Sequence, residues 1–167
     1  MNKRYKAQKM LGNGFFATVH MAEDRMTNTT VAVKIVRSDE RDQKSAEREI
    51  EFSEKMKEAS VSESTLTVFE NIVTLLNNFR ITGKECIHVA MFFEVLGMDV
   101  YSVIYKSNQQ KLTLNRIKRS SKNILDGLFF LHTTCKIMHL DLKPENLLVK
   151  VDPDNMDLSD SMEILLI

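Results

Sequence analysis

The sequence predicts an α+β fold of two lobes, on three observations. The first third of the chain has β-rich runs separated by tight turns. A charge-dense segment with helical spacing follows, and the second half is largely helical in its apolar spacing. The boundary between a β-rich and a helical lobe is expected near residues 94–98. We divide the chain into a first lobe, 1–96, the start of a second lobe, 97–150, and an acidic tail, 151–167.

The first lobe is expected to contain five strands and one long helix. The predicted strands are 5–11, 16–23, 30–36, 72–81 and 86–95, the first three forming an antiparallel meander. Residues 38–59 predict a helix with one modestly apolar face, formed by Ala46, Ile50, Ser53 and Met56. Residues 60–70 are expected to be a polar connection, and Thr82, Gly83 and Lys84 a hairpin turn.

The second lobe is expected to be helical before an irregular loop. Residues 99–106 form a short amphipathic stretch, and 113–135 predict a long helix with Thr113 as its N-cap. Its core-facing side is expected to hold Leu114, Ile117, Ile124, Leu125, Leu128 and Leu131. A polar loop continues to Asn146, and a short apolar run covers 147–149. The acidic tail then begins at Lys150.

Composition excludes several classes of protein. The 167 residues suffice for one domain or part of a larger one, and 23 basic residues balance 23 acidic ones. This balance argues against direct nucleic-acid binding and against a polybasic membrane anchor. No apolar run approaches the ~20 residues of a membrane span, and the basic N-terminus lacks the apolar core of a secretory signal. Cys86 and Cys135 provide no disulfide framework or metal spacing, so a reducing compartment is expected.

A glycine-containing turn is the first candidate for binding chemistry. Gly12 and Gly14 are separated by one residue and lie between two predicted strands. Glycine lets the backbone approach a ligand closely and tolerates positive φ, so inward N–H groups can hold phosphate oxygens. A simple hairpin turn is the alternative. The dinucleotide-binding fingerprint is disfavoured, because Ala17 stands where it requires glycine and a strand follows.

Lys34 is the second candidate. Strand alternation places Ala32 and Lys34 on one face and Val31, Val33 and Ile35 on the other. A lysine in the middle of a strand needs a phosphate or carboxylate partner if it is buried, and the small Ala32 leaves room for a flat ring. The alternative is an edge-strand lysine with its charge in water. Three glutamates of the following helix could pair with it: Glu47, Glu49 and Glu51. Glu49 lies at the inner margin of that helix.

The segment His139-Leu140-Asp141-Leu142-Lys143-Pro144-Glu145-Asn146 gives the sharpest signal. It places a carboxylate, an ammonium and a carboxamide in one proline-constrained loop. Phosphoryl transfer needs these groups to orient an attacking hydroxyl, neutralise the phosphoryl group and ligate Mg²⁺. A random polar loop rarely contains this combination.

With these three motifs in this order, the sequence resembles the protein kinases along essentially its whole length. The segments 74–79, 88–97, 104–108 and 127–132, together with Leu140, are similar to the SR-protein kinases, which phosphorylate serines of Arg/Ser-rich splicing factors. The resemblance implies a protein-kinase-like fold, ATP and Mg²⁺ as cofactors, and location in cytoplasm and nucleus. The alternative within kinases is another splicing-linked or dual-specificity group.

The resemblance also implies residue roles. Asp141 would be the catalytic base, Lys143 would contact the γ-phosphate, and Asn146 would ligate Mg²⁺. Lys34 would hold the α- and β-phosphates and pair with Glu49. The phosphate-covering turn would comprise Leu11, Gly12, Asn13, Gly14, Phe15, Phe16, Ala17, Thr18 and Val19. The adenine would be held by Val19, Ala32, Phe93, Glu94, Leu96 and Leu148, with Phe93 as the gatekeeper.

Two departures from the family pattern qualify this assignment. Leu140 stands where many kinases have the arginine that meets a phosphorylated activation loop, which implies an enzyme not switched in that way. The 167 residues contain no Asp-Phe-Gly segment, and Asp160 is followed by Ser161 and Met162. The acidic tail is interpreted as the possible start of a spacer insert. The sequence therefore leaves two hypotheses: a serine kinase, or a truncated remnant that binds nucleotide or protein without catalysis.

Overall fold

The computed structural model describes residues 4–61, 63–83, 86–106, 113–150 and 163–167. It confirms the α+β class. The chain forms two compact units, one from 1–54 with 74–95 and the other from 55–73 with 96–167. The lobe boundaries at residues 96 and 150 stay a prediction.

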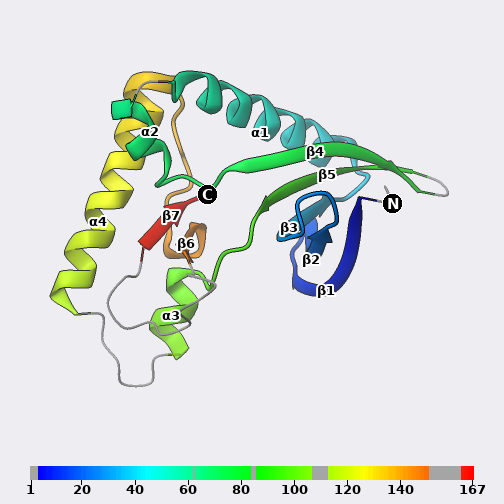
Figure 1. The fold of residues 1–167 in the computed structure, drawn as a ribbon, viewed down its shortest axis with the longest axis horizontal. Helices are drawn as coiled ribbons and strands as arrows, with labels where there is room; N and C mark the ends of the chain where they lie inside the picture. Colours follow the sequence, from blue (N-terminus) through cyan, green and yellow to red (C-terminus); the bar gives the residue numbers. More distant parts are fainter. Residues whose placement is uncertain (1–3, 62, 84–85, 107–112, 151–162) are drawn as a thin grey trace. The chain divides into compact units, whose positions relative to one another are not determined.

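The first unit is built on a five-stranded antiparallel sheet (Figure 1). Its strands are β1 (Tyr5–Asn13), β2 (Ala17–Asp24), β3 (Thr29–Val36), β4 (Leu75–Thr82) and β5 (Ile87–Glu94). The order is β1-β2-β3-β5-β4, which confirms the predicted meander of the first three strands. β5 inserts between β3 and β4, so β3 is a central strand with both edges hydrogen-bonded.

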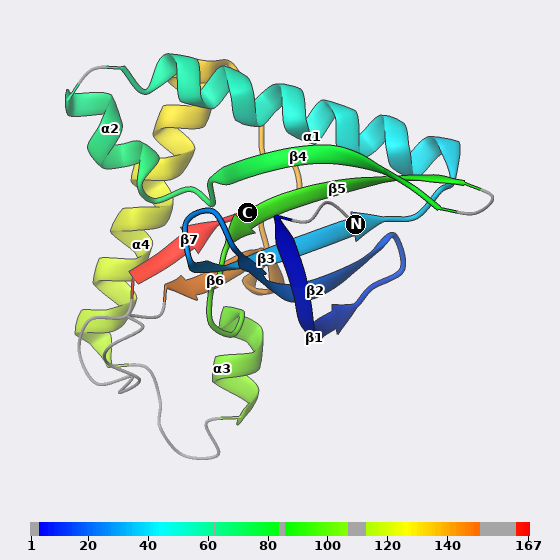
Figure 2. The same cartoon turned by 45° about the vertical axis from the view of Figure 1, so that its right-hand side comes forward.

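The two faces of this sheet carry separate apolar clusters. Val31, Val33 and Phe92 are buried on one face, where Phe92 stacks against Tyr5 and Phe79. On the other face, helix α1 (Glu40–Ala59) packs Ala46 and Ile50 against a cluster from β2, β3, β4 and β5. Figure 2 shows α1 running alongside the sheet. The predicted alternation of β3 and the predicted apolar face of α1 are both confirmed.

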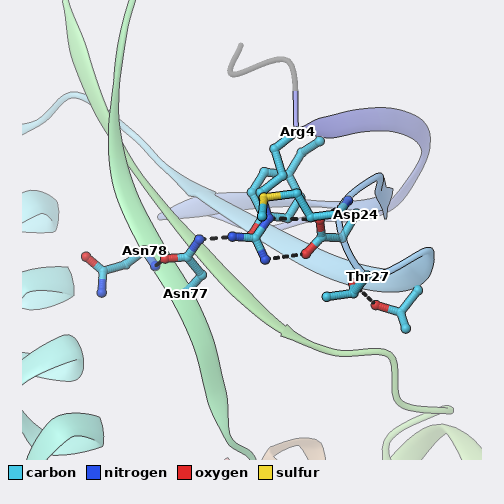
Figure 3. Close-up of polar contacts among 8 residues, drawn as sticks. Arg4, Asp24, Thr27, Asn77 and Asn78 are labelled. Carbon is cyan, nitrogen blue, oxygen red and sulfur yellow. Dashed lines mark hydrogen bonds and ion pairs between the residues drawn. The ribbon is translucent and has the colours of Figure 1, made fainter.

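An ion pair between Arg4 and the buried Asp24 closes the open end of β1 and β2. Arg4 donates from Nε to Asp24 Oδ1 at 2.8 Å and from Nη2 to Oδ2 at 2.6 Å (Figure 3). The Asp24 residue is only 3% exposed, and Met26 N also donates to its carboxylate. The guanidinium of Arg4 lowers the pKa of Asp24 to about 2. The neighbouring Asn77 donates to the Tyr5 hydroxyl at 2.9 Å, so β4 also contributes to this polar cluster.

The second unit packs helices around a two-stranded ribbon (Figure 2). Its helices are α2 (Glu63–Phe69), α3 (Val100–Lys106) and α4 (Leu114–Phe129), and α4 continues as a π-helical turn, Phe130–Cys135. Strands β6 (Leu147–Lys150) and β7 (Glu163–Leu166) pair antiparallel. Ile72, Phe130, Val149 and Leu166 lie in its buried core.

Two predictions for this region were wrong in part. The segment 60–70 is not merely a polar connection, because it contains α2, whose Val68 and Phe69 pack on the core. The long helix begins as predicted, with Thr113 Oγ1 accepting from Arg116 N. Its buried residues are Ser120, Gly127, Phe130, Leu131 and Cys135, whereas Leu114, Ile117 and Leu125 are exposed. The other three residues predicted for the core-facing side, Ile124, Leu128 and Leu131, do pack on the core, so this prediction is confirmed for half of its residues.

The predicted tail falls mostly outside the described residues, and Asp160 and Lys84 do as well. The last residues, 163–166, form β7. In the part of the chain that the structure describes, no helix is long and apolar enough to cross a membrane.

Candidate functional site

The glycine-containing turn is a β-hairpin between β1 and β2. Gly12 pairs with Val19 and Asn13 pairs with Thr18, and Gly14 N donates to Ala17 O at 2.9 Å across the turn. Phe15 and Phe16 stand exposed at the tip in an edge-to-face pair. The hairpin therefore projects two aromatic rings beyond its last backbone bond.

Neither glycine of the turn has positive φ, so the backbone conformation itself does not require glycine here. A Cβ built on Gly12 meets nothing within 4 Å, whereas one on Gly14 meets Ala17 O at 3.3 Å. The fold itself thus leaves open space at Gly12. That space is what close backbone approach of a ligand requires.

Lys34 is paired, and its partner is Glu49. Lys34 Nζ donates to both carboxylate oxygens of Glu49, at 2.8 Å and 2.7 Å. The edge-strand alternative fails, because β3 is central and Lys34 lies between Val19 on β2 and Met91 on β5. Of the other candidate partners, Glu47 contacts Arg80 instead. The bidentate geometry holds the lysine tip at a fixed place on the face covered by α1.

A cavity of about 240 Å³ adjoins this pair. Lys34 and Glu49 line it together with Phe16, Ala17 and Arg41. Both side chains of the pair are about one-third exposed, so the ammonium is reachable from solvent. The first unit therefore offers a fixed cation beside an aromatic-tipped hairpin.

The loop of the second unit folds its polar groups onto one carboxylate. Lys143 Nζ lies 2.8 Å from Asp141 Oδ2. Asn146 Nδ2 donates to Asp141 O at 2.8 Å and to Asp141 Oδ2 at 2.9 Å. A 3₁₀ turn, Pro144–Asn146, brings the amide back to the carboxylate, with proline setting φ at its first position. Asp141, Lys143 and Asn146 are thus assembled by sequence-local geometry.

The contacts of this loop favour the ionised carboxylate of Asp141 and the protonated amine of Lys143. Hydrogen bonds from Lys143 and then from Asn146 lower the pKa of Asp141 from its ordinary value. The Asp141 carboxylate in turn raises the pKa of Lys143. Since both Asn146 hydrogen bonds come from Nδ2, its Oδ1 atom lies outside them. A carbonyl oxygen such as this is one of the oxygen ligands that suit Mg²⁺, so the chemistry of Asn146 Oδ1 fits that ion.

Leu140 has an unusual backbone conformation. Its φ is 42°, in the left-handed region, and its side chain is 88% exposed. Non-glycine residues adopt such φ at a cost and are often found at functional loops. The turn brings Asp141 N to the carbonyl of His139. This conformation therefore directs the backbone immediately before Asp141.

His139 has a positioning contact to which sequence reasoning gave no role. Its Nε2 donates to Ile167 O at 2.6 Å, and Ile167 N donates to Asn146 O at 3.1 Å. Ile167, which follows β7, is thereby hydrogen-bonded to both ends of the loop from His139 to Asn146. Its place at the start of the loop motif was the only sequence signal for this role.

The residues predicted to hold an adenine lie in both units. In the sheet, Ala32 pairs with Phe93 and Val31 pairs with Glu94, one strand from Val19 on β2. In the second unit, Leu148 forms an isolated antiparallel β-bridge with Asp99. Gly97, which follows Leu96, donates from its backbone N to Val149 O at 2.7 Å. The structure thus brings Val19, Ala32, Lys34 and Phe93 together within one sheet. It also places Leu96 and Leu148 on adjacent segments of the other unit.

Comparison with known proteins gives one family. The model of the protein kinase domain matches residues 5–161. The chain is 38% identical over 148 residues to serine/threonine-protein kinase SKY1 of Saccharomyces cerevisiae, covering 89% of this chain and 20% of that protein. It is 39% identical over 150 residues to SRSF protein kinase 3 of Homo sapiens, covering 90% and 26%. It is 37% identical over 153 residues to protein kinase dsk1 of Schizosaccharomyces pombe, covering 92% and 28%. The chain spans 20–28% of the length of these three relatives.

Proposed function

Because this chain belongs to the protein kinase family, we propose that it forms part of a serine/threonine kinase of the SR-protein kinase type. The reaction is transfer of the ATP γ-phosphoryl group to serines of Arg/Ser-rich splicing factors. The observation that carries the proposal is the loop in which Lys143 and Asn146 converge on the carboxylate of Asp141. Relatives named SRSF protein kinase 3, from Mus musculus and Homo sapiens, support the substrate class.

Within the loop, Asp141 is proposed as the catalytic base. Its lowered pKa keeps it ionised, so it can accept and orient the proton of a serine hydroxyl. Lys143, kept charged by the same carboxylate, offers a cation to the γ-phosphate. Mg²⁺ would neutralise phosphate charge when bound, and Asn146 Oδ1 is the atom proposed to ligate it.

Within the first unit, Lys34 is proposed to bind the α- and β-phosphates. The Glu49 carboxylate fixes its position, which lowers the entropy that Lys34 loses on binding. The hairpin from Leu11 to Val19 would cover the phosphates, and the open space at Gly12 supports this. Val19, Ala32, Phe93, Glu94, Leu96 and Leu148 are proposed to hold the adenine.

A second function is proposed for the 167 residues taken alone: nucleotide binding without turnover. The observation that favours it is the lack of an Asp-Phe-Gly segment in this sequence, which leaves Asn146 as the single proposed metal ligand. Location in cytoplasm and nucleus and protein partners are also proposed, and relatives named SRSF protein kinase 3 support them. The balance of 23 basic and 23 acidic residues argues against nucleic-acid partners and a polybasic membrane anchor.

The test of the first function is a kinase assay on the full-length protein that contains this segment. We expect phosphorylation of an Arg/Ser-repeat peptide and little phosphorylation of a matched Lys/Ser-repeat peptide. Asp141→Asn should lower kcat by about 10²–10⁴-fold, because it removes a positioned base. Equal activity of the parent and Asp141→Asn proteins would contradict the assignment of the base.

The test of the second function uses the 167-residue chain. Calorimetry with a non-hydrolysable ATP analogue should show binding that Lys34→Ala weakens by about 10-fold or more, since a charge-assisted bond to phosphate is lost. Lys44→Ala is the matched control, because Lys44 pairs with Glu40 on the exposed side of α1. Mg²⁺ should change the affinity little. Robust peptide phosphorylation by this chain, lost in Asp141→Asn, would refute binding without turnover.

A further inference from the structure

A cysteine and a histidine lie within hydrogen-bond reach at the start of β5. Cys86 Sγ is 3.2 Å from His88 Nε2. On the other side of the ring, His88 Nδ1 is 2.9 Å from the backbone carbonyl of Val36, at the end of β3. Strand β5 pairs with β3, and this pairing positions the imidazole between the thiol and the carbonyl.

The carbonyl of Val36 determines where the imidazole proton lies. A carbonyl oxygen only accepts, so His88 Nδ1 must carry the hydrogen of this bond. In the neutral ring Nε2 then has a free lone pair, and the Cys86 thiol is the donor to it. Cys86 is then the nucleophile, His88 the base in contact with it, and the Val36 carbonyl the group that orients the base. This is the arrangement of an activated thiol.

The chain contains a second cysteine in a contrasting environment. Cys86 is partly exposed, whereas Cys135 is only 1% exposed. Burial raises the pKa of the Cys135 thiol. The backbone of Cys86 is held by Gly83 N, which donates to its carbonyl at 2.7 Å. One thiol is therefore reachable and beside a base, and the other is buried.

We propose that Cys86 is a covalent modification site, at which His88 accepts the thiol proton and the sulfur attacks a small electrophile of the peroxide class. In that step an S–O bond forms and the peroxide O–O bond breaks. With hydrogen peroxide the sulfur is oxidised to sulfenic acid, and the second peroxide oxygen leaves as water, taking up the proton that His88 accepted. This site is separate from the residues proposed for phosphoryl transfer.

The experiment measures thiol alkylation in the intact chain. The 167-residue protein is exposed to iodoacetamide at pH 7, and labelling of each cysteine is followed by mass spectrometry. In the folded chain, Cys86 should react at least about 10-fold faster than in the urea-unfolded chain, because the fold holds His88 Nε2 against the thiol and its Nδ1 on the Val36 carbonyl. Cys135 should instead react more slowly when folded. A folded-state rate for Cys86 at or below its unfolded rate would overturn the proposal.

A matched variant isolates the base. His88→Asn keeps an amide N–H for the Val36 carbonyl but removes the basic nitrogen near Sγ, so Cys86 labelling should fall about 10-fold. An unchanged rate in a folded variant would show that His88 is not the base. If the variant does not fold, the ratio of the Cys86 labelling rates in the folded and unfolded parent chain still tests the proposal. With hydrogen peroxide, a dimedone adduct is expected at Cys86 and not at Cys135, and the reverse pattern would also overturn the proposal.

Discussion

The polar groups of the two units are held together in different ways. Lys34 and Glu49 are 15 residues apart, on a strand and a helix, and meet because α1 packs on the sheet. Asp141 and Asn146 are five residues apart and meet within one loop. The first pair depends on the apolar core of its unit, whereas the second depends mainly on local backbone geometry. A change in packing and a change in a loop should therefore affect the two groups differently.

The largest expected effect comes from removing a core ring on the face of the first unit's sheet opposite α1. Phe92 is 1% exposed and lies between Tyr5 and Phe79, so Phe92→Ala should destabilise the chain by about 3–5 kcal/mol. Hydrogen exchange should speed up in β3 and β5 more than in β6, and binding of an ATP analogue should fall. Phe129→Ala is the control, because that ring is 65% exposed and its loss should cost about 0.5 kcal/mol or less. Equal losses of unfolding free energy in the two variants would contradict the dependence of the first unit on its apolar core.

A smaller effect is expected from Asn146→Ala, which removes both hydrogen bonds to Asp141. The loss of unfolding free energy should be about 0.5–1.5 kcal/mol, because one partly exposed amide is involved. Exchange in β3 should stay unchanged. The exposed Asn115, near the start of α4, offers a matched Asn→Ala control that should have no effect. Faster exchange in β3 of Asn146→Ala would show that the loop is not independent of the sheet.

A gain of stability is expected at Leu140. Its φ of 42° strains a leucine, so Leu140→Gly should stabilise the loop, by less than about 1 kcal/mol after the entropy cost of glycine. Leu142→Gly is the control, since Leu142 has no positive φ and glycine there should only destabilise. Chemical denaturation of both variants measures the difference. Destabilisation by Leu140→Gly equal to that by Leu142→Gly would mean that the strain is negligible.

A pH dependence is also expected, and it has the same sign in the two units. The folded-state pKa of Asp24 is lowered to about 2, below the ordinary ~3.9. The stability that its pairing with Arg4 contributes is therefore complete above about pH 4 and is lost as the pH falls through about 2. The same sign holds for Asp141, whose pKa is lowered by Lys143 and Asn146.

Carboxyl NMR titrations can measure both groups. Arg4→Met should return the pKa of Asp24 toward its ordinary value without moving that of Asp141. Lys143→Met should return the pKa of Asp141 toward its ordinary value without moving that of Asp24. A shift of both groups in either variant would contradict their independence.

The sequence predicted the local elements of this chain well, for a physical reason. The first three strands, α1 and the Thr113 cap follow from alternation, helical spacing and capping chemistry, all of which act over a few residues. The loop from His139 to Asn146 was recognised for the same reason, since its groups meet within five residues.

Predictions that depended on long-range packing were less complete. Residue spacing left three glutamates as candidate partners of Lys34, and the family resemblance implied Glu49. The packing of α1 on the sheet places Glu49 against Lys34, whereas Glu47 contacts Arg80. Helical spacing also placed Leu114, Ile117 and Leu125 on the core side of α4, but the structure leaves them exposed. The residues of α2 looked polar in sequence, but Phe69 joins the core through its contact with Phe130.

The sequence by itself determined the class of fold, the order of the motifs and the chemistry of the loop, because these rest on residue types and short spacings. The tertiary structure decided which surfaces are buried, that β5 lies between β3 and β4, and that Ile167 is tied to His139 and Asn146. It also placed the Val36 carbonyl against His88, 52 residues away, which fixes the proton position on that ring. Contacts of this kind join segments that are far apart in the chain. Those segments are held together mainly by the burial of apolar surface, and local sequence does not specify which surfaces meet.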